Sequence, residues 1–121
     1  MARLENNIQN TYVAGENIGV YRPVMLDTDG QLYLADHTNL AHISKVIGVS
    51  VDSGLTGAFI TVLEFGFNTN VSLNSYSPGP VFVGVNVLTQ VKPSTGFVKK
   101  IGDVPKAGEI HVNPAQSVCL N

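Results

Sequence analysis

The chain has 121 residues and a mass of 12.9 kDa, which suits one domain with a modest core and is too short for two cores. Seven basic and nine acidic residues give a formal net charge of −2, and this balance excludes the basic surface that binding to nucleic acid phosphates requires. Charged residues make up 13% of the chain, about half of the usual quarter, so we expect part of the surface to be covered by other subunits.

The sequence also bears on where the protein is made. No apolar run approaches the roughly 18 residues of a membrane-spanning helix, and residues 1–7 lack the apolar segment of a signal peptide, so direct secretion is not expected. The single cysteine, Cys119, excludes an intrachain disulfide and favours synthesis in a reducing cytoplasm.

Residues 1–19 differ from the rest because polar residues outnumber the scattered apolar ones. Such a segment buries too little apolar area to offset the roughly 1–2 kcal/mol per residue that backbone ordering costs. Two interpretations remain open: a frayed terminus or first edge strand, and an extended docking arm that is ordered only against a neighbouring molecule. If the segment is an arm, deletion of residues 2–13 should leave the β domain folded and abolish docking. Its anchors would be Arg3, Leu4, Ile8, Tyr12 and Val13.

From residue 20 onward the apolar residues come in short runs broken by Gly, Pro, Asn and Asp. Val24–Leu26, the turn residues Asp27–Gly30 and the run Gln31–Ala35 together predict a β-hairpin. No segment shows sustained helical periodicity, and only residues 36–44 could hold a single helical turn. The predicted fold class is therefore all-β. Further strands are expected over residues 45–51, 59–65, 81–88, 97–101 and 109–112.

A weak internal repeat refines this prediction. Two similar units of about residues 20–66 and 77–114 would pair to close one small barrel or sandwich, because a three-stranded unit alone leaves its apolar face wet. Residues 20–121 would then form a single β domain behind the arm. The alternative is that glycines recur by chance. The similar segments are Pro23–Leu26 with Pro80–Val83, Val46–Val49 with Lys100–Asp103, and Gly57–Val62 with Gly108–Val112.

The motifs that would carry catalysis or ion binding are weak. Cys119 lies two residues from the C-terminus, where a preorganised nucleophile pocket is not expected. Asp27–Gly30 has its glycine too early for a calcium loop, and Gly54–Gly57 lacks the Lys-Ser/Thr of a phosphate loop, so both are interpreted as turns. We therefore expect neither an enzyme nor a bound cofactor.

The histidines and aromatic residues are interpreted in the same way. His37 and His42 are five residues apart, so neither a helix face nor a strand face presents both as metal ligands, and no metal is expected. Phe65, Phe67 and Tyr76 are candidates for a subunit interface, and a sugar-stacking platform that also includes Phe82 is the alternative.

The order of these motifs resembles the head-decoration proteins of tailed bacteriophages, both the lambda-type proteins and the broader capsid-cement families. The resemblance covers about residues 20–112, and the second half extends beyond the minimal lambda-type fold. It is carried by Arg22–Thr28, Leu32–Asp36, Ile47–Val51 and Ile60–Gly66, and then by Gly79–Val83, Val87–Thr89 and Val98–Gly102, which are similar to small β modules of phage head and tail appendages.

The resemblance implies a non-enzymatic virion protein on the outer capsid surface, made in the bacterial cytoplasm. Such proteins usually bind as homotrimers at junctions between major capsid subunits and stabilise the expanded head, with an N-terminal arm on the shell. The alternatives are a receptor- or glycan-binding module of a head or tail fibre, acting through Tyr33 or Tyr76, and a cellular subunit of a polymeric coat.

Overall fold

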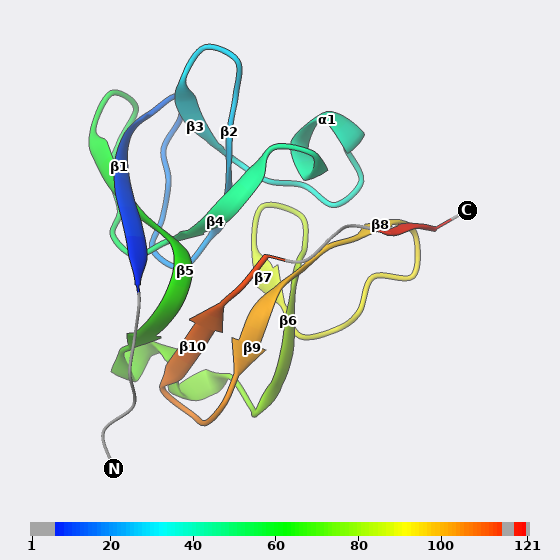
Figure 1. Ribbon diagram of the computed structural model, residues 1–121. Helices are drawn as coiled ribbons and strands as arrows, with labels where there is room; N and C mark the ends of the chain where they lie inside the picture. Colours follow the sequence, from blue (N-terminus) through cyan, green and yellow to red (C-terminus); the bar gives the residue numbers. More distant parts are fainter. Residues whose placement is uncertain (1–6, 115–117, 121) are drawn as a thin grey trace.

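A computed structural model describes residues 7–114 and 118–120 (Figure 1). As predicted, this part of the chain is almost entirely β, and none of its helices is long and apolar enough to span a membrane. The elements are β1 (Ile8–Ala14), β2 (Pro23–Leu26), β3 (Gln31–Leu34), α1 (Leu40–Ile43), β4 (Val46–Ser50), β5 (Phe59–Thr69), the 3₁₀ helix η1 (Val71–Ser75), β6 (Gly79–Val83), β7 (Leu88–Thr89), β8 (Gly96–Val98), β9 (Lys100–Val104), β10 (Glu109–Val112) and β11 (Val118–Leu120).

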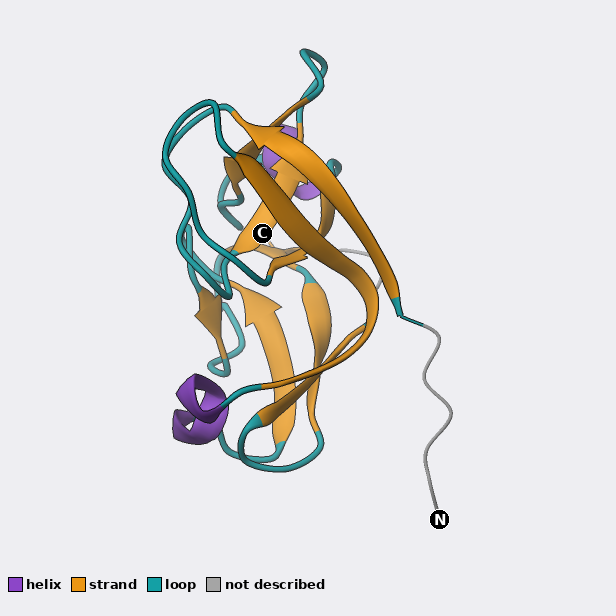
Figure 2. Cartoon of the chain, turned by 90° about the vertical axis from the view of Figure 1, so that its left-hand side faces the viewer, coloured by secondary structure: helices purple, strands orange, loops and turns teal. Residues whose placement is uncertain are grey.

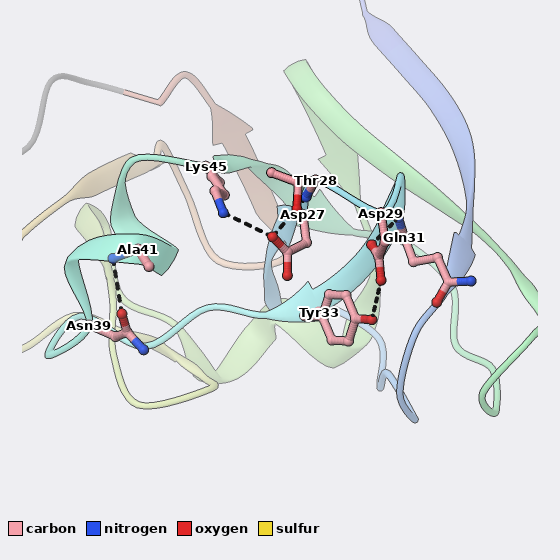
Figure 3. A network of polar contacts seen from close by, with 8 residues as sticks. All are labelled: Asp27, Thr28, Asp29, Gln31, Tyr33, Asn39, Ala41 and Lys45. Atoms are coloured by element: carbon pink, nitrogen blue, oxygen red, sulfur yellow. Dashed lines mark hydrogen bonds and ion pairs between the residues drawn. The ribbon is translucent and has the colours of Figure 1, made fainter.

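The predicted hairpin is formed by β2 and β3. In its turn the Gly30 N–H donates to the Asp27 carbonyl at 2.9 Å. The Asp27 carboxylate accepts a bond from Lys45 Nζ at 2.9 Å, and Asp29 accepts one from the Tyr33 hydroxyl at 2.6 Å (Figure 3). The two carboxylates therefore stabilise the turn and the segments beside it, which agrees with the interpretation of this motif as a turn.

Five strands close a small barrel. Within a sheet of order β1-β3-β2-β4-β5-β10-β9-β6-β7, β1 also pairs with β5, so the first five strands meet in a ring. The closing pairs are parallel between β1 and β3, with Ala14 opposite Leu32, and antiparallel between β1 and β5, with Tyr12 opposite Ile60. The barrel core consists of Ala14, Ile18, Val24, Leu32, Ile60 and Val62.

The N-terminal segment is therefore not an arm over residues 8–19, and the boundary at residue 19 is wrong. Ala14 and Ile18 are buried in the barrel core, and β1 pairs with both β3 and β5, so this stretch begins with a strand, as one interpretation expected, but that strand is not at an edge. The sequence estimate failed because it counted only apolar area, whereas a strand between two others also satisfies its backbone polar groups. Residues 2–13 thus include most of the strand that closes the barrel. Arg3 and Leu4 lie outside the described residues.

β5 leaves the barrel and begins a second sheet made of its own C-terminal half with β10, β9, β6 and β7 (Figures 1 and 2). Gly66 marks the change: it is buried, its φ is +124°, and a Cβ there would overlap Asn7. β5 supplies both cores, since Ile60 and Val62 face the barrel and Leu63 the second core. The second core consists of Tyr21, Ala35, Ile43, Val49, Leu63, Leu73, Val81, Val83, Leu88, Ile101, Val104, Ile110 and Val112.

Two local predictions need correction. Residues 81–88, expected as one strand, are split between β6 and β7, which pair antiparallel through a turn in which the Gly84 N–H donates to Val87 and Asn86 has a φ of 61°. The apolar run hid this turn because its outward-facing residues, Val85 and Val87, are apolar too. Residues 97–101 are likewise divided, since Gly96–Val98 pairs with β11 in a separate two-stranded sheet.

The segments that resemble each other in the sequence occupy equivalent places in the two sheets. Val24 lies opposite Gly48 between β2 and β4, and Val81 lies opposite Gly102 between β6 and β9. In both pairs the register shifts directly after the valine. The same local irregularity at matching positions indicates that the two halves are built on one pattern.

The two glycines of this pattern permit the same close approach. A Cβ at Gly48 would overlap the carbonyl oxygen of Leu63 on β5, and a Cβ at Gly102 would overlap that of His111 on β10. Val49 pairs with Leu63 and Asp103 pairs with His111, so the two overlaps are at equivalent points. Each glycine lets two neighbouring strands pack more closely than a side chain would allow.

The pattern also extends one strand upstream of the predicted unit. Asn10–Thr11 of β1 lies beside Val62 and Thr61 in the first half, and Asn68–Thr69 of β5 lies beside Ile110 and Glu109 in the second. The strand facing β10 is thus the counterpart of β1. This register makes Val62, rather than Ile60, the equivalent of Ile110, two residues away from the match that the sequence suggested.

Candidate functional site

An apolar face is formed where β1, β5 and β10 run side by side. The Phe67 ring stacks on the His111 ring with centroids 4.3 Å apart and planes 19° apart, and the Phe65 ring meets His111 edge-on at 5.5 Å. Ile8 lies opposite Phe65 in register and is 53% exposed, while Phe65 is 38% exposed. We call Ile8, Phe65, Phe67 and His111 the aromatic face.

Hydrogen bonds and ring contacts hold the aromatic face in place. The Asn7 side chain donates to the Phe67 carbonyl at 3.0 Å and accepts from the Phe67 N–H at 2.9 Å, which ties the chain before β1 to β5. His111 is fixed between its two ring contacts and opposite Asp103 in the ladder. A surface whose side chains are already ordered loses less conformational entropy when a partner covers it.

The proposed anchors Tyr12 and Val13 serve the barrel. Tyr12 packs against its core, and its hydroxyl donates at 2.9 Å to the same Glu64 oxygen that accepts from Asn10 at 2.6 Å. Burial and, after it, the Glu64 carboxylate raise the Tyr12 pKa. Val13 is half-buried between Phe59 and Gln31. Of the five predicted anchors, only Ile8 is described as exposed.

Tyr76 lies away from the aromatic face and lines a cavity of about 370 Å³. The same cavity is lined by Arg22, Ser72 and Ser75, and by apolar residues that include Val87 and Leu88. Burial raises the pKa of Tyr76, and the positive charge of Arg22 partly opposes this shift. The predicted trio of interface residues is therefore divided between two sites.

The remaining candidates do not converge. Among the described residues, no group of three or more His, Cys, Asp or Glu is placed to hold a metal ion. His37 and His42 each bury an Nδ1 that has no hydrogen-bond partner within the described part of the chain; His42 lies in α1, and His37 precedes that helix. Cys119 lies on β11, opposite Phe97 of β8. Phe82 is buried, so it does not take part in an exposed sugar-stacking platform.

Sequence reasoning missed two of the residues that matter here. His111 was not among the interface candidates, although the strand register places its ring against both phenylalanines. Arg22 was noted only within a motif, although it contributes the cavity's cationic side chain. The signal that could have located His111 is the repeat, because aligning Asn10–Thr11 with Asn68–Thr69 sets β10 against the end of β5.

The chain matches no protein-family model, and a search of curated proteins found no similar sequence. Its function has to be inferred from its own residues and their geometry.

Proposed function

We propose that this protein is a non-enzymatic decoration protein of a tailed-phage head, which binds the outer capsid surface at junctions between major capsid subunits and stabilises the expanded shell. The observation that supports this best is the aromatic face, in which Ile8 and Phe65 are exposed beside the half-buried rings of Phe67 and His111, on a chain that is poor in charge. Exposed apolar clusters of this kind mark sites of protein contact. The order of motifs along residues 20–112 supports the phage assignment.

The mechanism follows from linkage. A protein that binds only the assembled shell lowers the free energy of that state and so raises the cost of separating its subunits. Covering a phenylalanine fully is worth about 1.5–3 kcal/mol. Because Phe65 is only 38% exposed and Ile8 53%, the aromatic face contributes modestly per copy. Association into a homotrimer would add these contributions by avidity. We propose that the protein acts as such a trimer.

Binding to shells tests the proposal directly. The purified protein is mixed with expanded capsids of the phage that encodes it, prepared without it, and occupancy is measured by electron microscopy. The test variant is Phe65→Asp, which places a carboxylate in the aromatic face. The matched control is Phe59→Asp on the same strand, because Phe59 is 72% exposed and lies at the opposite end of β5.

We expect wild-type protein and Phe59→Asp to fill the same sites, and Phe65→Asp to lose at least about tenfold in affinity, since burying an unpaired charge is costly. Circular dichroism checks that both variants are folded. Wild-type protein that leaves shells bare would refute capsid binding. Phe65→Asp filling the sites like wild type would refute the role of the aromatic face. Solution mass at working concentration tests the trimer separately.

A receptor- or glycan-binding module remains the alternative, and the observation that favours it is the cavity beside Tyr76, where a phenol and hydroxyl groups surround a concave site. Binding on a glycan array that is lost in Tyr76→Ala and retained in Phe65→Asp would favour this function over capsid binding.

A further inference from the structure

The cavity beside Tyr76 lies where the second half fails to close as the first half does. In the barrel, Ala14 of β1 pairs with Leu32 of β3 and seals the ring. Counting along the equivalent registers, Ser72 corresponds to Ala14, and Leu88 corresponds to Leu32. Ser72 and Leu88 both line the cavity instead of pairing with each other.

The physical cause lies in η1. The chain that follows the counterpart of β1 turns into this 3₁₀ helix over Val71–Ser75, with the Asn70 side chain capping its start by accepting from the Ser72 N–H at 2.9 Å. β7 therefore forms the edge of the sheet, and among the described residues it pairs with β6 alone. Just after β7, the Gln90 side chain donates to the Ser77 carbonyl at 2.6 Å and accepts from the Ser77 N–H at 3.1 Å. The cavity of about 370 Å³ beside Tyr76 therefore stays open between η1 and β7, and we call it the seam.

The chemistry of the seam is divided between an apolar wall and a polar end. Val20, Val87 and Leu88 supply apolar surface, and Val20 and Val87 remain 42% and 39% exposed. Arg22 and Tyr76 supply a guanidinium and a phenol. Within residues 7–114 and 118–120, no carboxylate forms an ion pair with Arg22, although its backbone is fixed by bonds to Ser50.

A half-buried arginine that forms no ion pair within the described part of the chain is an attractive site for a carboxylate, which its guanidinium can bind through two parallel hydrogen bonds. The volume lies at the lower end of the roughly 300–1,000 Å³ of ligand sites, so it suits a side chain better than a large ligand. We propose that the seam binds a glutamate side chain presented by a partner protein, with its methylene groups against Val87 and Leu88 and its carboxylate on Arg22. This site is separate from the aromatic face and does not depend on capsid binding.

The test uses the full chain and small probes, followed by nuclear magnetic resonance of the backbone amides. The probes are N-acetyl-valyl-glutamate amide, its glutamine analogue, and glucuronate as an acidic sugar. We expect the glutamate probe to shift amides of η1 and of residues 85–88, and to bind roughly tenfold more tightly than the glutamine probe, the ratio that a lost charge-assisted pair gives.

Variants assign this preference to Arg22. Arg22→Gln should abolish the tenfold difference between the two probes, whereas Lys45→Gln, which removes the same charge near the β2–β3 turn, should keep it. If Arg22→Gln does not fold, Arg22→Lys keeps the charge without the planar fork and should reduce the difference severalfold. Equal binding of the two probes, shifts confined to other residues, or a preference that survives in Arg22→Gln would overturn the proposal. Tighter binding of glucuronate than of the glutamate probe would overturn the protein partner in favour of an acidic glycan.

Discussion

Replacing either equivalent glycine by alanine should be strongly destabilising, and Gly48 is the sharper case. A Cβ at this position overlaps the Leu63 carbonyl oxygen and lies 3.0 Å from both the Leu63 carbonyl carbon and the Glu64 Cα, and all three contacted atoms belong to the backbone. No rotamer change can relieve a backbone contact, so β4 and β5 must separate inside a closed ring. Because β5 is also paired with β1 and β10, this separation spreads into neighbouring ladders.

The expected loss follows from the contacts involved. Overpacking of a buried site costs typically 1–3 kcal/mol, and weakening one or two hydrogen bonds of the β4–β5 ladder adds about 1 kcal/mol each. We therefore expect Gly48→Ala to lower the free energy of unfolding by about 2–5 kcal/mol. Gly102→Ala should cost no more than this, because its sheet is open at β7 and has more freedom to shift.

Urea unfolding followed by circular dichroism measures both values, with an unchanged m-value as the sign that the transition stays comparable. Gly19→Ala is the matched control, since a Cβ there meets the flexible Arg22 side chain at 3.3 Å and should change stability by less than about 0.5 kcal/mol. A Gly48→Ala protein as stable as this control would refute the close-approach explanation for the repeated glycines.

Three further predictions concern the barrel and its phenols. Deleting residues 2–13 should unfold the domain, with loss of the β signal in circular dichroism, because the deletion removes most of β1; a folded product would show that the barrel closes without this strand. Burial raises the pKa of Tyr12, Tyr21 and Tyr76 above the value near 10.0 at which the unfolded chain releases its phenolic protons. The folded state therefore keeps these protons longer, and the free energy of unfolding should fall as pH rises above 10.0. Phenolate absorbance measures the pKa values, and alkaline unfolding measures the loss of stability. Glu64→Gln should lower the pKa of Tyr12 by removing a negative charge and leave that of Tyr76 unchanged, and equal shifts at both would contradict the Glu64 contact.

The candidate sites could be anticipated only in part. Phe65 and Phe67 stand out in the sequence as apolar residues two apart near the end of a strand, which places them on one face. That their face also includes His111 depends on a pairing between β5 and β10. The seam was not predictable, because it arises from η1, whose residues show the periodicity of neither a strand nor a helix.

Local order was determined by the sequence alone. The all-β class, the β2–β3 hairpin and the helical turn at α1 follow from short-range patterns of apolar, turn-forming and capping residues, because these act within a few positions. The equivalence of Ile-Gly segments in the two halves could also be read directly. Each of these features depends on residues close together in the chain.

Only the tertiary structure decided which strands meet. β1 is too polar to be assigned by composition, yet it closes the barrel because β3 and β5 both offer it backbone partners. β5 serves two sheets because Gly66 lets it change direction there. Strand pairing between distant segments carries no local signature, since any extended backbone offers the same donors and acceptors. The residues that line the aromatic face and the seam were therefore brought together by long-range packing.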